Sequence, residues 1–213
     1  MNISIYKEII KNLKPLTNSK FMYNRKRWEK LNPKFTNFIS EFENVDISRQ
    51  DVIDSFQNFY IGKSNWEKPF LLTMIWGFAD TGYGTYRTNN YIAEEKNQNL
   101  IQKSFEAVKN NNLELAYKSL KSIKGLNISY ISKILYFATK ACDYKEYALI
   151  YDIRVAKSLI KLSTTPEIFE IVEVVPSSKF VHYKIYNTLM HKYSAELNLD
   201  AESLEMFLFE QRF

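Results

Sequence analysis

Apolar residues recur at spacings of three and four along nearly every long segment of this 213-residue chain. This spacing follows the turn of an α-helix and gives each segment one apolar face. Strand signals are limited to two short β-branched runs, at residues 148–151 and 171–175. The sequence therefore predicts an all-α fold with about nine or ten helices.

Capping residues mark where several of the expected helices begin. Ser48 and Asp51 match a capping box, and Pro69 falls in the first turn of an apolar helix over residues 70–78. Asp152 stands at a further helix start. The remaining helices are expected over residues 3–13, 97–108, 113–123, 130–141, 177–197 and 200–209.

No linker, repeat or low-complexity tract interrupts these segments. We therefore expect one folded unit over residues 1–213, in which the N-terminal helices of residues 1–65 lie beside the region 66–213. The five glycines are too few for glycine-rich repeats or phosphate loops. His182 and His191 have no acidic or cysteine companion at ligand spacing, so we expect neither a metal site nor a cofactor.

Several features indicate the compartment. A single cysteine, Cys142, cannot form an internal disulfide, which favours a reducing cytoplasm. The first residues carry charges too early for a signal peptide, and no apolar run approaches the roughly 18 residues of a membrane span. We expect a cytoplasmic, nucleoid-associated monomer without membrane contact.

Basic residues are concentrated in one part of the chain. The net charge is +5, and residues 121–161 hold eight basic and three acidic residues, an excess equal to that of the whole chain. Such a stretch is typical either of a surface that attracts nucleic acid or of a solvated helix face.

Within this stretch, Gly125, Leu126 and Asn127 separate two expected helices. A glycine here permits a backbone conformation that other residues avoid. One interpretation is a helix-hairpin-helix, whose free amides at the start of the second helix hold a DNA phosphate. The other is an ordinary turn between two helices.

Two sequence segments carry a resemblance to a known family. Lys133 in "SKILYF" precedes Asp152 in "YDIRVAK" by nineteen positions, and residues 76–90 read "WGFADTGYGTYRTNN". Together they resemble the helix-hairpin-helix DNA glycosylases, specifically a small bacterial branch with the 8-oxoguanine DNA glycosylase fold. The resemblance spans about residues 66–213 and implies two helical lobes with the active site between them.

The resemblance implies catalytic roles for Lys133 and Asp152. The lysine amine would attack the sugar C1′ as the base departs and form a Schiff base. Burial or neighbouring positive charge would have to lower its pKa. A carboxylate at a helix N-terminus stays ionised and would stabilise the cationic sugar.

The resemblance also implies binding residues. Some of the aromatic residues near the glycines would line a base pocket or wedge into the duplex, and the last helix would add a stacking aromatic residue. The candidates for the base pocket are Trp76, Phe78, Tyr83, Tyr86, Phe207 and Gln211. The candidates for DNA contact are Lys124, Gly125, Leu126, Asn127, Arg87, Asn89 and Arg154.

The expected function is therefore a DNA glycosylase acting on double-stranded DNA that contains a modified base. An oxidised purine and a hypermodified phage-type base are both open as substrates, as is strand cleavage at the abasic (AP) site through the Schiff base. The alternative is a non-catalytic helix-hairpin-helix module that binds DNA or a protein. A third reading is an interaction domain whose basic stretch is ordinary surface.

Overall fold

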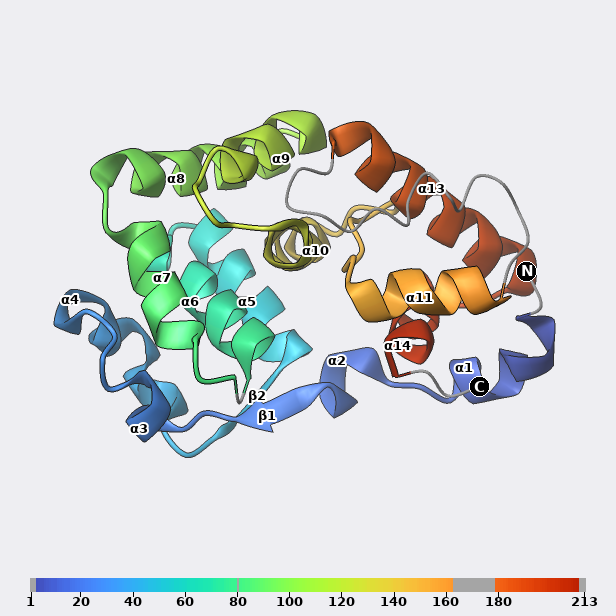
Figure 1. Ribbon diagram of the computed structural model, residues 1–213, viewed down its shortest axis with the longest axis horizontal. Coiled ribbons are helices and arrows are strands. Elements are labelled where there is room, and N and C mark those ends of the chain that lie inside the picture. The colour runs from blue at the N-terminus through green and yellow to red at the C-terminus, as the bar shows by residue number, and fades with distance from the viewer. Residues whose placement is uncertain (1–2, 80, 163–178, 211–213) are drawn as a thin grey trace.

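The computed structural model describes residues 3–79, 81–162 and 179–210, and within them nearly all regular structure is helical (Figure 1). These ranges contain thirteen α-helices and a single small sheet. Its strands β1 (Lys20–Met22) and β2 (Asp46–Ser48) pair antiparallel. The all-α prediction is confirmed, although neither strand was expected.

The additional helices lie mostly near the N-terminus, where the segments are short. The helix expected over residues 3–13 is split in two, and Pro15 and Pro33 each begin a four-residue helix, as their fixed φ angle favours. In order, these elements are η1 (Ser4–Tyr6), α1 (Lys7–Lys11), α2 (Pro15–Asn18), α3 (Arg25–Trp28), α4 (Pro33–Thr36) and η2 (Asn37–Phe42).

Three helices of the middle region follow. The predicted capping box is confirmed at α5 (Arg49–Tyr60), where Ser48 and Asp51 bond each other's backbone amides. The apolar α6 (Glu67–Phe78) begins three residues earlier than expected. A turn then leads to α7 (Gly84–Ile92).

The helix α10 (Ile128–Ala141) forms the centre of the molecule and is seen end-on in Figure 1. It packs against α5 and α6 and against the pair α8 (Glu95–Lys109) and α9 (Leu113–Lys121). All of its residues from Ile131 to Thr139 are buried, as expected of a helix enclosed on every side. The chain continues through α11 (Ile153–Leu162), α13 (Phe180–Leu197) and α14 (Ala201–Glu210).

The segment 148–151, a strand candidate, is an extended connector without a strand partner. Side chains satisfy its buried backbone instead: the hydroxyls of Tyr183 and Tyr186 donate to the carbonyls of Leu149 and Ile150 at 2.8 and 2.7 Å. The Tyr151 amide donates to Ser132 of α10 at 2.9 Å. These bonds hold the following residue, Asp152, beside α10. The other strand candidate, residues 171–175, lies outside the described residues.

Elements distant in sequence also meet. The helix α1 packs on α14, where the rings of Tyr6 and Phe207 lie 5.1 Å apart. Across the described residues, no helix has the combination of length and hydropathy that crossing a bilayer requires.

Candidate active site

A cavity of about 470 Å³ opens where α5, α6, α10 and α14 converge. This volume lies within the range of small-molecule sites, about 300–1,000 Å³. Lys133 and Asp152, separated by nineteen positions in the sequence, both line it. The rest of its wall consists of Ser19, Lys20, Phe21, Arg49, Trp76, Gly77, Phe78, Ala79, Thr81, Ser129, Tyr130, Ile150, Arg154, Glu205 and Phe209.

The amine of Lys133 is buried in the wall of this cavity, and only 7% of the residue is exposed. Its Nζ donates to the hydroxyl of Ser129, one helical turn earlier, at 2.8 Å and lies 3.9 Å from Oδ2 of Asp152. The same nitrogen lies over the ring of Tyr130, 5.2 Å from its centroid. A lysine so enclosed faces a large cost for carrying its charge.

Burial accordingly lowers the pKa of Lys133 below its ordinary value. The positive charge of Arg49 acts in the same direction, while the carboxylates of Asp152 and Glu205 oppose it. The net effect is a lowered pKa, which increases the share of nucleophilic free amine at a given pH.

Asp152 divides its two carboxylate oxygens between two tasks. Oδ1 accepts the backbone amide of Arg154 at 3.1 Å, which caps α11 as the sequence predicted. Oδ2 accepts the Ser129 hydroxyl at 2.8 Å. Because Ser129 also accepts from Lys133, its hydroxyl bridges the amine and the carboxylate. Sequence reasoning missed Ser129, although its position four residues before Lys133 places both on one helix face.

Gly77 makes room for the lysine. A Cβ at this position would lie 2.9 Å from Cδ of Lys133, closer than atoms in contact approach. The glycine of α6 therefore allows the lysine stem to lie flat against the helix backbone. The neighbouring Trp76 is fixed by a bond of 3.0 Å from its Nε1 to the carbonyl of Ser19.

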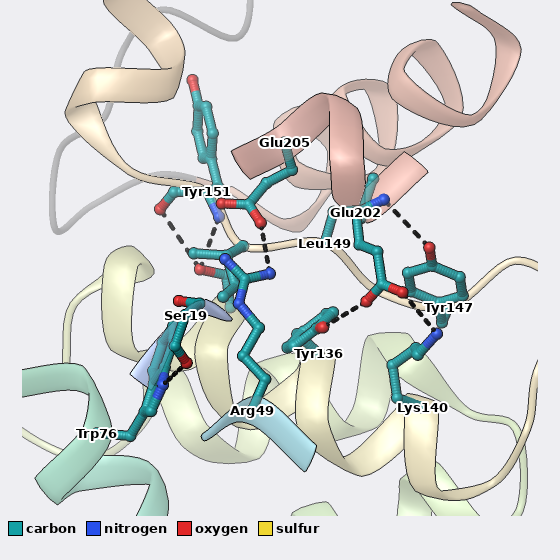
Figure 2. A network of polar contacts seen from close by, with 12 residues as sticks. Ser19, Arg49, Trp76, Tyr136, Lys140, Tyr147, Leu149, Tyr151, Glu202 and Glu205 are labelled. Atoms are coloured by element: carbon teal, nitrogen blue, oxygen red, sulfur yellow. Dashed lines mark hydrogen bonds and ion pairs between the residues drawn. The ribbon is translucent and has the colours of Figure 1, made fainter. Parts of the chain in front are cut away.

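A buried network of charged and polar side chains includes two residues of the cavity wall, Arg49 and Glu205 (Figure 2). Arg49, the first residue of α5, donates through Nη1 to Oε2 of Glu205 on α14 at 2.8 Å. Three residues earlier on α14, Glu202 accepts from Tyr136 at 2.6 Å and from Lys140 at 3.3 Å. Sequence reasoning missed the Arg49–Glu205 pair, since 156 positions separate its members and neither lies in a recognised motif.

The turn between α9 and α10 combines a left-handed glycine with a capped helix start, features that a helix-hairpin-helix shares with an ordinary turn. Gly125 adopts a φ of +83°, a left-handed conformation that favours glycine. The side chain of Asn127 caps α10 at the amide of Tyr130. Lys124 and Gly125 are exposed, whereas Leu126 is buried.

Among the other DNA-contact candidates, Arg154 lines the cavity and lies over the ring of Phe209, 5.0 Å from its centroid. Arg87 is exposed on α7, the helix whose Tyr91 donates to the carbonyl of Gly125 at 3.0 Å. Asn89 has a structural contact: its amide donates to the carbonyl of Lys30 at 2.7 Å.

The base-pocket candidates are only partly brought together. Trp76 and Phe78 line the cavity. Tyr83 and Tyr86 do not, because they project from the start of α7 with 72% and 69% of their surfaces exposed.

Phe207 also lies away from the cavity. It is fully buried in the core, because the face of α14 toward the cavity carries Glu205 and Phe209, four positions apart. Phe209 therefore occupies the wall position expected of Phe207. Gln211 lies outside the described residues.

Within the described ranges, no three His, Cys, Asp or Glu side chains are grouped so as to hold a metal ion. The profile of one protein family matches residues 14–209; its description reads "Putative 8-oxoguanine DNA glycosylase OGG-like protein". Searches of curated proteins and of solved structures return no match.

Proposed function

This chain belongs to the 8-oxoguanine DNA glycosylase OGG-like family, and on that premise we propose that it excises a modified base from double-stranded DNA with Lys133 as the nucleophile. One observation carries the proposal. A buried lysine with a lowered pKa faces a cavity of base size, with a carboxylate joined to it through a hydroxyl.

The first chemical step uses the Lys133–Ser129–Asp152 chain of hydrogen bonds. The free amine of Lys133 attacks C1′ of a flipped nucleotide with its electron pair. The N-glycosidic bond breaks, and the base leaves with the bonding pair and takes up a proton from solvent. The surplus proton on the attacking nitrogen passes through the Ser129 hydroxyl to Asp152.

The second step opens the sugar. The C1′–O4′ bond breaks, O4′ takes the proton held by Asp152, and a protonated Schiff base joins C1′ to Lys133. Loss of a proton from C2′ then allows the 3′ phosphate to leave, which is the AP-lyase reaction. Before it takes up the amine proton, the carboxylate of Asp152, fixed at the start of α11, stabilises positive charge on the sugar.

We assign duplex binding to exposed groups on the turn before α10, on α7 and on α11. The hairpin amides and Lys124 would bind phosphates without reading sequence, and Arg87 and Arg154 would extend this basic surface. Tyr83 and Tyr86 are assigned to the duplex rather than to the pocket, because their exposed rings can replace the flipped base in the stack.

The proposal is tested by trapping the Schiff base. Wild-type protein is incubated with borohydride and either an abasic duplex or a panel of modified-base duplexes, and covalent complexes are counted on denaturing gels. Lys133→Gln should abolish trapping while duplex affinity stays within about twofold. Lys103→Gln, an exposed lysine on α8, serves as the matched control and should trap like wild type.

Trapping that survives Lys133→Gln would show that another group is the nucleophile. If wild type binds DNA in a salt-dependent manner but neither traps nor releases any base, the chain is a non-catalytic binding module.

A further inference from the structure

Arg49 and Glu205, two residues of the cavity wall, each hold one buried polar atom without a partner. Both residues line the cavity, and they are only 2% and 1% exposed. Nη1 of Arg49 and Oε2 of Glu205 bond each other. Nε of Arg49 and Oε1 of Glu205 have no hydrogen-bond partner.

The position of the pair is rigid. The guanidinium lies between two rings, 5.3 Å from the centroid of Trp76 and 5.2 Å from that of Tyr136. Figure 2 shows Arg49 extending from the start of α5 toward Glu205, with Trp76 and Tyr136 on opposite sides. Trp76 is itself anchored to Ser19. The two unpartnered atoms are therefore fixed in space before any ligand arrives.

Such an arrangement is costly if it is only structural. A buried ion pair gains little over apolar residues of similar size, and each unpartnered polar atom adds a desolvation penalty of its own. The unpartnered donor is Nε of Arg49 and the unpartnered acceptor is Oε1 of Glu205, and both residues line the same cavity. A ligand edge that offers an acceptor beside a donor is complementary to this pair of atoms.

We propose that Arg49 and Glu205 recognise the flipped base, and that the base presents a lactam edge, an N–H next to a carbonyl oxygen. Oε1 of Glu205 accepts from the N–H, and Nε of Arg49 donates to the carbonyl. This proposal rests on the proposed function, since it takes the cavity to be the base pocket. Among modified bases, 8-oxopurines, hypoxanthine and uracil carry this edge, which guanine and thymine also carry, so the pair selects the edge and not the damage; bases methylated at the lactam nitrogen are excluded.

The first test changes the substrate and leaves the protein intact. Base release by wild type is measured on duplex pairs that differ by one methyl group: hypoxanthine against 1-methylhypoxanthine, and uracil against 3-methyluracil, with 8-oxoguanine as a further lactam base. At least one lactam base should be released. Where that base has a methylated partner in the panel, the partner should be released at a kcat/KM about 10- to 100-fold lower. Equal rates within a pair overturn the proposal.

The second test changes Glu205. Glu205→Gln keeps an oxygen for Arg49 but turns an amide donor toward the cavity, where the base also offers a donor. The rate of lactam-base release should fall by a factor at least ten times larger than the rate of trapping on an abasic duplex, because the abasic duplex contains no base to recognise. Glu202→Gln, a buried carboxylate on the same helix outside the cavity wall, is the control and should lower both activities equally.

The outcomes separate the two proposals. If wild type traps on abasic DNA but releases no lactam base, base recognition by Arg49 and Glu205 is wrong and the lysine chemistry stands. If wild type does not trap on abasic DNA yet releases lactam bases with the expected methyl discrimination, the recognition stands and the Schiff base is wrong. A parallel loss of both activities in Glu205→Gln indicates a purely structural ion pair.

Discussion

The hydroxyl of Ser129 has two partners of opposite charge, since it accepts from Lys133 and donates to Asp152. No direct hydrogen bond joins the amine to the carboxylate, whose nearest oxygen lies 3.9 Å away. Proton exchange between the two therefore depends on one side chain that is itself uncharged.

Removing this hydroxyl should slow the chemistry without removing the nucleophile. Ser129→Ala should lower the single-turnover trapping rate about 10- to 100-fold, at the lower end of general acid–base effects, and Ser129→Thr should restore most of it. The control is Ser122→Ala, an exposed serine that bonds its own helix at Lys118. A trapping rate unchanged in Ser129→Ala would mean that water carries the proton instead.

At this scale the sequence predicted the residues that belong to a motif and missed those that do not. The structure brings Lys133 and Asp152 to one cavity, and the resemblance of their two segments to a known family indicated them. Arg49 and Glu205 meet only through the tertiary fold, which brings the start of α5 within side-chain reach of α14 and which no local pattern records. The resemblance implies an aromatic residue on the last helix without specifying the helix face, so it indicated Phe207, whereas the structure places Phe209 at the cavity wall.

At the scale of elements, the turn before α10 can be tested by comparison with another turn. Gly125 and Gly62 both have left-handed backbones, with φ of +83° and +75°. Gly62 follows the far end of α5 from Arg49, away from the cavity. Substituting alanine should cost either turn about 1 kcal/mol of stability.

Only the turn at Gly125 should affect DNA. Gly125→Ala should weaken binding to every duplex about tenfold, whatever base it carries, because the hairpin amides shift away from the phosphate. Gly62→Ala should bind like wild type in the same fluorescence-anisotropy titrations. Equal affinities for the two variants would favour an ordinary turn between helices.

Element boundaries were predictable where the chain caps itself. Ser48 and Asp51 at α5 and Asp152 at α11 act through neighbouring residues, so the signal is local. The segment 148–151 was not predictable, because tyrosines 34 and 36 positions away replace the strand partner it lacks. The strands at residues 20–22 and 46–48 are too short to carry a period.

For the molecule as a whole, the buried lysine links stability to pH. The pKa of Lys133 is lowered in the folded chain from its ordinary value of 10.5. Between the lowered value and 10.5, the unfolded chain holds a proton on this lysine that the folded chain has released. Unfolding takes up that proton, so the free energy of unfolding contributed by this site rises with pH across the window.

Lys133→Gln has no such proton. The free energy of unfolding of wild type relative to Lys133→Gln should therefore increase with pH, by at most about 1.4 kcal/mol per pH unit. Urea titrations from neutral pH to pH 10 measure this difference, with Lys103→Gln as the exposed control. A difference that stays constant with pH would mean that Lys133 keeps its proton when folded.

The ion pair between α5 and α14 also has a consequence for synthesis on the ribosome. A nascent chain that has emerged as far as α11 already contains Lys133, Ser129 and Asp152, but the wall that Glu205 and Phe209 provide has not yet been made. Until α14 docks, the amine faces water and Arg49 has no carboxylate beside it. The surroundings of Lys133 are thus completed late, after nearly all of the described chain has been translated.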